Sequence, residues 1–317
     1  TVAVASQSGD FAFATADGTL TFGNKTKPKQ TEQVKVETLV TDLATDQEGR
    51  TWVAATGTGD LLVISRNPST APRWLEKQET EGPLVAPRFS SDGKTLVTVK
   101  GPGNVICMDI GTGLVQQRFT LPESKSMNEK NHITMVVTDS SQIYCGTSTG
   151  KVEVLDLKTS TLTKTIPVSR SGSAITSLSL APDGKQLLAG DAVGNTVWIN
   201  PLNDSPPVSR QAHKGRVRAA TYSPDGRWAA TAAEGGTVVI WDVAQQSKRS
   251  ILNGHDGLVQ ALSFSPDSRL LVSGDRQGEL RLWETQTGKQ IWKASLASAE
   301  FQPSDHPVIT EILKSPD

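Results

Sequence analysis

Cysteine, methionine and histidine are scarce in this chain of 317 residues, which holds two Cys, three Met and four His. Cys107 and Cys145 have neither CxxC spacing nor a cysteine-rich framework around them, so we expect buried free thiols and no disulfide scaffold. No run approaches the roughly 18 apolar residues of a transmembrane helix. An excess of one charge is also lacking, because 32 basic residues stand against 33 acidic ones, and this balance gives no support for a nucleic-acid-binding face.

The chain also lacks an initiator Met and a signal peptide, since Thr1 opens directly on a strand pattern. We interpret this as a trimmed or processed chain, and missing flanking domains stay open as an alternative. A cytoplasmic location is expected on the same grounds.

Signatures of catalysis are lacking as well. There is no G-x-S-x-G and no Ser or Cys in a nucleophile elbow. The Gly-rich stretches at 57–60 and 101–105 have neither the strand-to-helix context nor the Lys of a phosphate loop, so they are predicted to be hairpin turns. The sequence therefore predicts no enzyme, no cofactor and no metal ion.

What the sequence does contain is a repeat, clearest over residues 213–242. Within it VRAATY, RWAATAA and TVVIWD alternate like strands, and the turns SPDG and EGG separate them. Residues 255–284 repeat the pattern, with Pro266 lying 42 residues after Pro224, which lies 42 residues after Pro182. A period near 42 with Trp-Asp closing the third strand is typical of four-stranded propeller blades.

These residues make the chain similar to the WD-repeat β-propeller family, through Ser223-Pro224-Asp225-Gly226, Trp241-Asp242, Gly254-His255 and Trp283. The similarity covers the whole chain and is close in three repeats, whose regular SPDG turns resemble those of bacterial members. It implies an all-β fold of four-stranded antiparallel blades in a single domain, residues 1–317. Near-equal intervals between the first-turn aspartates predict seven blades: Asp46, Asp92, Asp139, Asp183, Asp225, Asp267 and Asp317.

One predicted blade is composite, because the chain ends resemble parts of one repeat. Residues 308–314 match an inner strand and residues 1–23 match the outer three, if Gly9 aligns with Gly278 and Gly18 with Gly288. Such closure leaves no sheet edge unpaired. The predicted blades span residues 308–317 with 1–23, then 34–76, 82–120, 131–167, 173–211, 213–252 and 255–294.

Four segments are too polar or too Pro-rich for strands and are predicted to be surface loops: 23–33, 66–74, 121–131 and 200–211. The three Lys of KTKPKQ in the first of them are interpreted as a solvated loop, with a basic tongue as the alternative. In place of Trp241, other repeats carry an apolar residue that we expect to pack between adjacent sheets: Ile64, Met108, Leu155 and Ile199.

All four histidines, His132, His213, His255 and His306, precede a predicted first strand. Equivalent positions on different blades are too far apart to share one metal ion. The family resemblance implies instead a hydrogen-bonded chain within each blade. The matching sets are His213, Thr231 and Trp241, then His255, Ser273 and Trp283. The acidic member of the family's chain is predicted to be missing, replaced by Gly235 and by Gln277.

The resemblance also implies a binding rim where the loops entering the inner strands meet the turns between second and third strands. The family's contact positions fall on Arg216, Arg218, Glu234, Leu258, Gln260, Arg276, Thr176 and Thr310. Three Arg close to the mouth of the central pore suit a carboxylate or an acidic peptide, because guanidinium groups make bidentate, charge-assisted hydrogen bonds. Ordinary solvated surface charge is the alternative.

The function expected from these features is a non-catalytic, monomeric platform that binds a protein or peptide segment on this rim. Two alternatives stay open. One is a regulatory or sensor domain of a larger protein. The other is a propeller enzyme such as a metal-dependent hydrolase, although the predicted first strands offer mostly Val, Ala, Leu, Ser and Thr where such an enzyme needs acids, amides or His.

Overall fold

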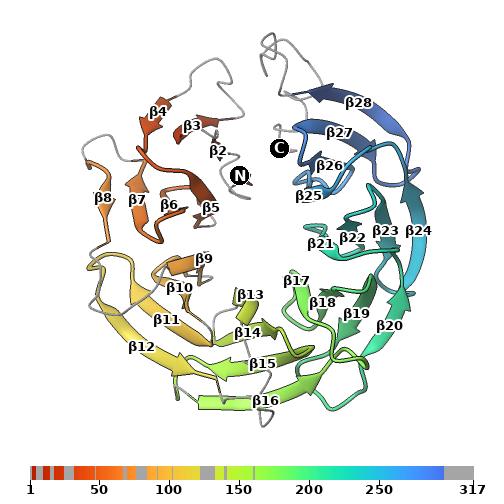
Figure 1. The fold of residues 1–317 in the computed structure, drawn as a ribbon, viewed down its shortest axis with the longest axis horizontal. Helices are drawn as coiled ribbons and strands as arrows, with labels where there is room; N and C mark the ends of the chain where they lie inside the picture. Colours follow the sequence, from red (N-terminus) through yellow and green to blue (C-terminus); the bar gives the residue numbers. More distant parts are fainter. Residues whose placement is uncertain are drawn as a thin grey trace. The chain divides into compact units, whose positions relative to one another are not determined.

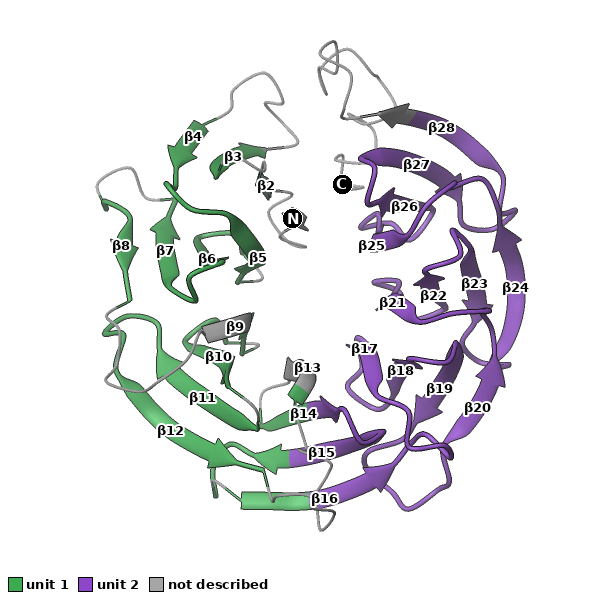
Figure 2. Ribbon diagram, in the orientation of Figure 1, with its two compact units in different colours: residues 1–144, 155–163 green, residues 145–154, 164–317 purple. Residues whose placement is uncertain are grey.

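The computed structural model divides the chain into two compact units, residues 1–144 with 155–163 and residues 145–154 with 164–317 (Figure 2). It describes residues 2–4, 10–14, 18–24, 32–46, 48–66, 70–75, 84–90, 92–101, 103–121, 133–138, 141–159 and 161–295. The described part of the chain is built from strands (Figure 1), and no helix in it has the length and hydropathy needed to span a membrane.

Every sheet consists of four consecutive strands in sequence order. The first unit contains β1 (Val2–Val4), β2 (Asp10–Ala14), β3 (Thr19–Asn24) and β4 (Glu32–Lys35); β5 (Val40–Thr45), β6 (Thr51–Thr56), β7 (Leu61–Ser65) and β8 (Arg73–Trp74); and β9 (Leu84–Phe89), β10 (Thr95–Lys100), β11 (Asn104–Asp109) and β12 (Val115–Thr120). A further sheet contains β13 (Ile133–Thr138), β14 (Gln142–Thr147), β15 (Lys151–Asp156) and β16 (Thr161–Pro167).

The second unit contains the sheets formed by the three repeats that match the family pattern closely. Their strands are β17 (Ile175–Leu180), β18 (Leu187–Asp191), β19 (Asn195–Ile199) and β20 (Val208–Gln211); β21 (Val217–Tyr222), β22 (Trp228–Ala233), β23 (Val238–Asp242) and β24 (Ser247–Leu252); and β25 (Val259–Phe264), β26 (Leu270–Asp275), β27 (Glu279–Glu284) and β28 (Gln290–Ser295). The pairing within each of these sheets is antiparallel, for example Thr231 opposite Val239.

The SPDG turns are built by side-chain hydrogen bonds to the backbone. Between β21 and β22, the Ser223 hydroxyl donates to the Asp225 carboxylate over 2.5 Å and accepts from the Trp228 amide over 2.9 Å. Gly226 follows with φ of 70°, a left-handed conformation that costs glycine little. Ser, Asp and Gly thus each satisfy a different requirement of the same turn, which explains why the motif recurs.

The core lies between neighbouring sheets within each unit. The apolar residues predicted to pack there are at most 4% exposed, as are Trp241 and Trp283. In the second unit, the rings of Trp198 and Trp241 meet edge to face with centroids 4.8 Å apart, a geometry that favours aromatic pairs. Cys107 and Cys145 are both buried, as expected, and burial raises the pKa of the Cys107 thiol to about 12.

The prediction of a composite blade from residues 308–314 and 1–23 is wrong for the N-terminal residues. The first sheet already has four strands from residues 2–35, and residues 308–314 lie outside the described residues. The error comes from matching Gly18 with Gly288. The Gly18 carbonyl accepts from the Val36 amide over 2.8 Å, as the Gly194 carbonyl accepts from Ala212 over 3.1 Å. Gly18 therefore belongs to the turn between second and third strands.

Three of the predicted loops contain an outermost strand. The strand β8 lies in the segment 66–74 and β20 in 200–211, whereas β4 begins at Glu32, near the end of 23–33, and continues to Lys35. Residues 122–131 lie outside the described residues. The strands are polar because the fourth strand of each sheet faces solvent, as the exposed Ser209, Arg210 and Gln211 of β20 show. The blade boundary predicted at residue 34 consequently moves to Val40, where β5 begins.

The turn glycines permit a matched test of backbone strain. Gly194 has φ of 95°, and a Cβ there would lie 2.2 Å from the His213 carbonyl oxygen, whereas Gly184 has φ of 71° with nothing within 4 Å. Gly194→Ala should lower the unfolding free energy by roughly 3–5 kcal/mol, and Gly184→Ala by about 1–2 kcal/mol, because only the first adds steric overlap to strain. Urea denaturation measures the unfolding free energies of both variants. Equal losses would contradict the close approach of the His213 carbonyl to residue 194.

Candidate functional site

The predicted rim residues of the second unit lie around three adjacent inner strands, β17, β21 and β25 (Figure 1). Arg216 and Arg218 flank the first residue of β21, and Glu234 follows β22 directly. Because Val217 pairs with Ala233, these side chains come from one end of the sheet. Leu258, Gln260 and Arg276 hold the same positions around β25 and β26, where Val259 pairs with Asp275.

Arg218 is engaged by Glu234 within its own sheet. Its Nε donates to a Glu234 carboxylate oxygen over 3.0 Å, and a terminal guanidinium nitrogen contacts the same oxygen. The Glu234 amide in turn donates to the Arg216 carbonyl over 3.1 Å. Because both side chains remain more than one third exposed, such a pair contributes at most about 1 kcal/mol. The pair does, however, use some of the N–H donors of the Arg218 guanidinium group.

Arg216 and Arg276 are exposed, and no ion pair holds either guanidinium among the described residues. The backbone beneath Arg276 is fixed, since its amide donates to the Leu258 carbonyl over 2.9 Å. Gln260 is exposed and Leu258 partly buried. These residues present two cationic groups from firmly held backbone.

Thr176 has a structural contact. Its hydroxyl donates to the Val217 carbonyl over 2.6 Å, which connects β17 to β21. Thr310 lies outside the described residues, as do His132 and His306. A binding role for the predicted rim residues stays a prediction.

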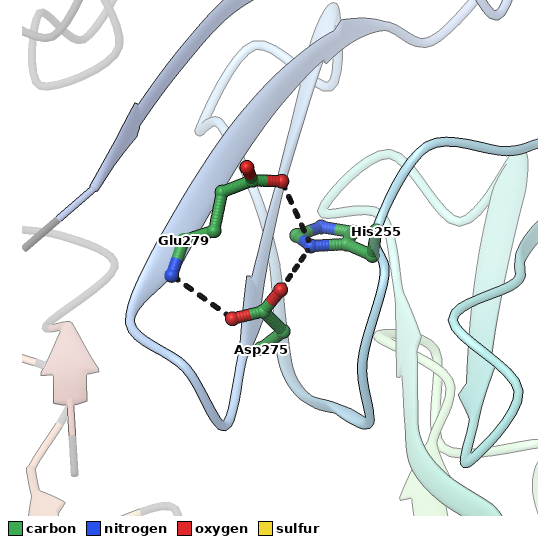
Figure 3. Close-up of side chains that lie close together, drawn as sticks. All are labelled: His255, Asp275 and Glu279. Atoms are coloured by element: carbon green, nitrogen blue, oxygen red, sulfur yellow. Dashed lines mark hydrogen bonds and ion pairs between the residues drawn. The ribbon is translucent and has the colours of Figure 1, made fainter.

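His255 lies at the centre of a buried polar chain (Figure 3). Its Nδ1 is 2.9 Å from an Asp275 carboxylate oxygen and its Nε2 is 2.7 Å from the Ser273 hydroxyl. The Trp283 indole donates to that hydroxyl over 2.8 Å. The other Asp275 oxygen accepts from the Gln277 and Glu279 amides over 3.0 and 2.9 Å.

The prediction that Gln277 replaces the acidic member of this chain is therefore wrong. Asp275 is that member, two residues earlier, at the end of β26. Burial raises the pKa of Asp275, but the hydrogen bonds from His255, Glu279 and Gln277 outweigh it and lower that pKa overall. The position of Asp275, shortly before the turn glycine Gly278, is the signal that identifies it. Its carboxylate accepts hydrogen bonds from the backbone amides of this turn.

A metal-like grouping is present here, because ligand atoms of His255, Asp275 and Glu279 lie within 4.8 Å of one another. All three side chains already have partners. The Glu279 carboxylate pairs with the Arg281 Nε over 2.5 Å and lies 3.7 Å from His255. Binding an ion would break the bond between His255 and Asp275, so we interpret the group as a device that orients the imidazole.

The corresponding chain around His213 is incomplete. His213 Nε2 lies 2.9 Å from the Thr231 hydroxyl, which also accepts from the Trp241 indole over 2.9 Å. Ala233 pairs with Val217 as Asp275 pairs with Val259, so this sheet has no acid at the place of Asp275. His213 Nδ1 is consequently buried without a hydrogen-bond partner in the protein.

Burial, together with the positive charge of Lys248, lowers the pKa of His213 from 6.5 to about 4. The unfolded chain therefore holds more protons than the folded chain between these values. The stabilisation is complete above pH 6.5 and is lost as the pH falls toward about 4.

We predict that the wild-type protein loses about 3 kcal/mol more than His213→Gln over that window, because the amide does not titrate. Chemical denaturation at a series of pH values measures both curves. The subtraction removes contributions from carboxylates that the two proteins share. Parallel curves would show that His213 keeps its proton in the folded state.

Comparison with known proteins gives three findings. The family profile "WD40: WD domain, G-beta repeat" matches residues 205–242 and 246–284. The curated protein "Target of rapamycin complex subunit wat1" of Schizosaccharomyces pombe is 27% identical over 196 residues, 60% of each chain, so this chain spans about 60% of that relative's length. The crystal structure of the computationally designed Ika8 protein superposes with a TM-score of 0.71 at 20% identity, covering 90% of this chain and 84% of that one. The last likeness concerns the fold alone.

Proposed function

Because this chain belongs to the WD-repeat β-propeller family, we propose that it is a non-catalytic platform that binds a segment of a partner protein. Its fold is an all-β propeller whose blades are four-stranded antiparallel sheets. Such propellers serve in general as scaffolds for protein interaction. The relative from Schizosaccharomyces pombe is by its name a subunit of a complex, and membership of a complex requires binding surfaces.

The observation that carries the proposal is the pair Arg216 and Arg276. Both lie at the same end of neighbouring sheets, both are exposed, and neither is neutralised by a carboxylate among the described residues. Guanidinium groups bind carboxylates in a bidentate, charge-assisted manner. The surface around them, the binding rim, therefore suits an acidic peptide segment.

A non-catalytic role agrees with the state of the ionisable groups around this rim. His255, Asp275 and Glu279 are engaged with one another and with Arg281, and Glu234 is engaged with Arg218. These three acids and this one histidine thus each have a partner inside their own sheet. We assign these groups to structure, and binding to the exposed arginines.

Seven blades, a monomeric state and a cytoplasmic location are further parts of the proposal. The regular spacing of the repeats, with one four-stranded sheet for each described repeat, supports the blade number. Near-zero net charge supports binding to proteins in preference to nucleic acids.

The proposed rim is tested by replacing Arg216, Arg218 and Arg276 with Ala in one variant. Loss of the three guanidinium groups should weaken binding of Glu-rich peptides by at least about tenfold, and wild-type binding should fall as salt is raised. Fluorescence anisotropy with a labelled peptide library measures both.

Arg269→Ala is the matched control, because Arg269 is an exposed Arg in the turn between β25 and β26, away from the rim. Equal thermal melting of the two variants and the wild type would show that each is folded. If the triple variant and the control bind the same peptides with wild-type affinity, this rim is not the binding face.

A further inference from the structure

The sheet β17–β20 lacks most of the polar chain present in the two sheets that follow it, β21–β24 and β25–β28. The Gly194 carbonyl accepts from the His213 amide over 3.0 Å, and the Gly150 carbonyl accepts from Ser169 over 2.9 Å. Ser169 therefore holds the position of His213. By strand register, Ala189 stands opposite Val197 where Thr231 stands opposite Val239.

Only the acidic member of the chain is retained in this sheet. Asp191 pairs with Ile175 as Asp275 pairs with Val259. Serine is much smaller than the imidazole whose position it holds. Beside it lies a hollow of about 560 Å³ lined by Ser169, Ser171, Asp191, Arg170 and Arg210. Its volume lies within the range of small-ligand pockets.

A second hollow supports this origin. In the first unit, the Gly18 carbonyl accepts from Val36, so the next residue, Glu37, holds the place of His213. Glu37 is exposed, and it lines a separate hollow of about 560 Å³. These two hollows thus share one feature, the absence of a buried imidazole at the turn beside them.

The negative charge of Asp191 is already compensated. One carboxylate oxygen accepts from the Val193 and Asn195 amides over 3.0 and 2.8 Å, and the other accepts from the Asn195 side chain over 2.7 Å. The residue is fully buried. A ligand in the hollow therefore meets a carboxylate whose charge the protein has satisfied.

The positive charges at the same hollow are not compensated. Arg170 and Arg210 are exposed, and among the described residues neither forms an ion pair. Arg210 donates only to the Ser209 carbonyl beside it, over 3.1 Å. Two guanidinium groups against one saturated carboxylate leave a net positive charge, which favours an anion.

Hydroxyl groups complete the wall. The Ser169 and Ser171 hydroxyl oxygens lie 3.2 Å apart, and the Ser169 hydroxyl accepts from the Ser173 amide over 3.0 Å. Either hydroxyl can donate in the contact between Ser169 and Ser171, and when Ser171 donates, the Ser169 proton is available for a ligand. Serine hydroxyls and Arg forks together provide donors in several directions, whereas a carboxylate offers only two oxygens to receive them.

We propose that the hollow beside Asp191 is a binding site for a phosphoryl group, named here the Ser169 pocket after the residue that opens it. A phosphoryl group carries up to two negative charges and three acceptor oxygens, which match the two guanidinium groups and the serine hydroxyls. The pocket is formed by the loop that enters β17 and the turn between β18 and β19, and it contains none of Arg216, Arg218 and Arg276. The inference therefore goes beyond the proposed function and does not rest on it.

The first test uses inorganic phosphate as the probe, with ionic strength held constant. Isothermal titration calorimetry should detect binding to the wild type, and Arg170→Gln with Arg210→Gln should weaken it by at least about tenfold. Arg269→Gln removes one positive charge of the same kind from an exposed turn and should bind phosphate as the wild type does. Absent phosphate binding, or equal binding by the double variant, overturns the proposal.

The second test places a larger side chain in the hollow. Ser169→His places an imidazole beside Asp191, as His255 lies beside Asp275. In mildly alkaline buffer, where the imidazole is neutral, phosphate binding should be lost while the melting temperature rises. Ser169→Ala keeps the hollow and should lower phosphate affinity only a few-fold. A folded Ser169→His protein that binds phosphate with wild-type affinity overturns the proposal.

A third measurement separates two sources of the phosphoryl group. A phosphoserine peptide that binds more tightly than both inorganic phosphate and its unphosphorylated form indicates a phosphorylated protein segment. Equal affinity for the peptide and for inorganic phosphate indicates a small phosphorylated compound. Both results support the phosphoryl site, as does binding of inorganic phosphate alone, which also indicates a small compound. Failure of both probes to bind overturns the site whatever the triple Arg variant of the binding rim shows.

Discussion

One backbone hydrogen bond recurs in four of the sheets and fixes the loops that enter the sheets that follow them. The carbonyl of the glycine between second and third strands accepts from the residue that follows the fourth strand, as seen for Gly18, Gly103, Gly150 and Gly194. The bond needs a positive φ and an approach too close for a Cβ. It holds the loop that enters the next sheet against the turn, and at Gly194 that loop carries the buried His213 and the rim residue Arg216.

The second unit shows the same polar chain at three stages of completeness. Around His255 every polar atom of the chain has a partner, and the acid that orients the imidazole is Asp275. Around His213 the acid is absent and one ring nitrogen is buried without a partner. Beside Asp191 the acid remains but the histidine does not, and a hollow takes its place. A network in which every polar atom is hydrogen-bonded stabilises a sheet. An incomplete network leaves either a buried polar atom without a hydrogen bond, which costs free energy, or an open space.

Sequence alone predicts the repeating part of this fold well, because strand alternation and turn chemistry are local. The SPDG turns, the buried residues at the position of Trp241 and the buried cysteines are all found as expected. The outermost strands β4, β8 and β20 were missed because one side of them faces solvent, so polarity there does not distinguish a strand from a loop.

The remaining errors have the same root. Residue spacing alone does not show which turn of the repeat Gly18 belongs to, so the sequence matches it to the wrong turn. The hydrogen bond from the Val36 amide to the Gly18 carbonyl identifies the correct turn. Asp275 was missed for a similar reason, since its role depends on reaching both a turn amide and the His255 ring. Which of the exposed arginines lacks a partner is likewise a property of three-dimensional neighbours, as the engagement of Arg218 by Glu234 shows.

The short, exposed fourth strands have a consequence for how such a chain changes over time. The second and third strands of a sheet, such as β22 and β23, are buried almost throughout, so a new side chain there must suit neighbours on both sides. An outer strand such as β8, only two residues long with its Trp half exposed, meets few such demands. If copies of one ancestral segment arose by duplication, mutations would accumulate fastest in the fourth strands, and the copies would remain most similar in their second and third strands.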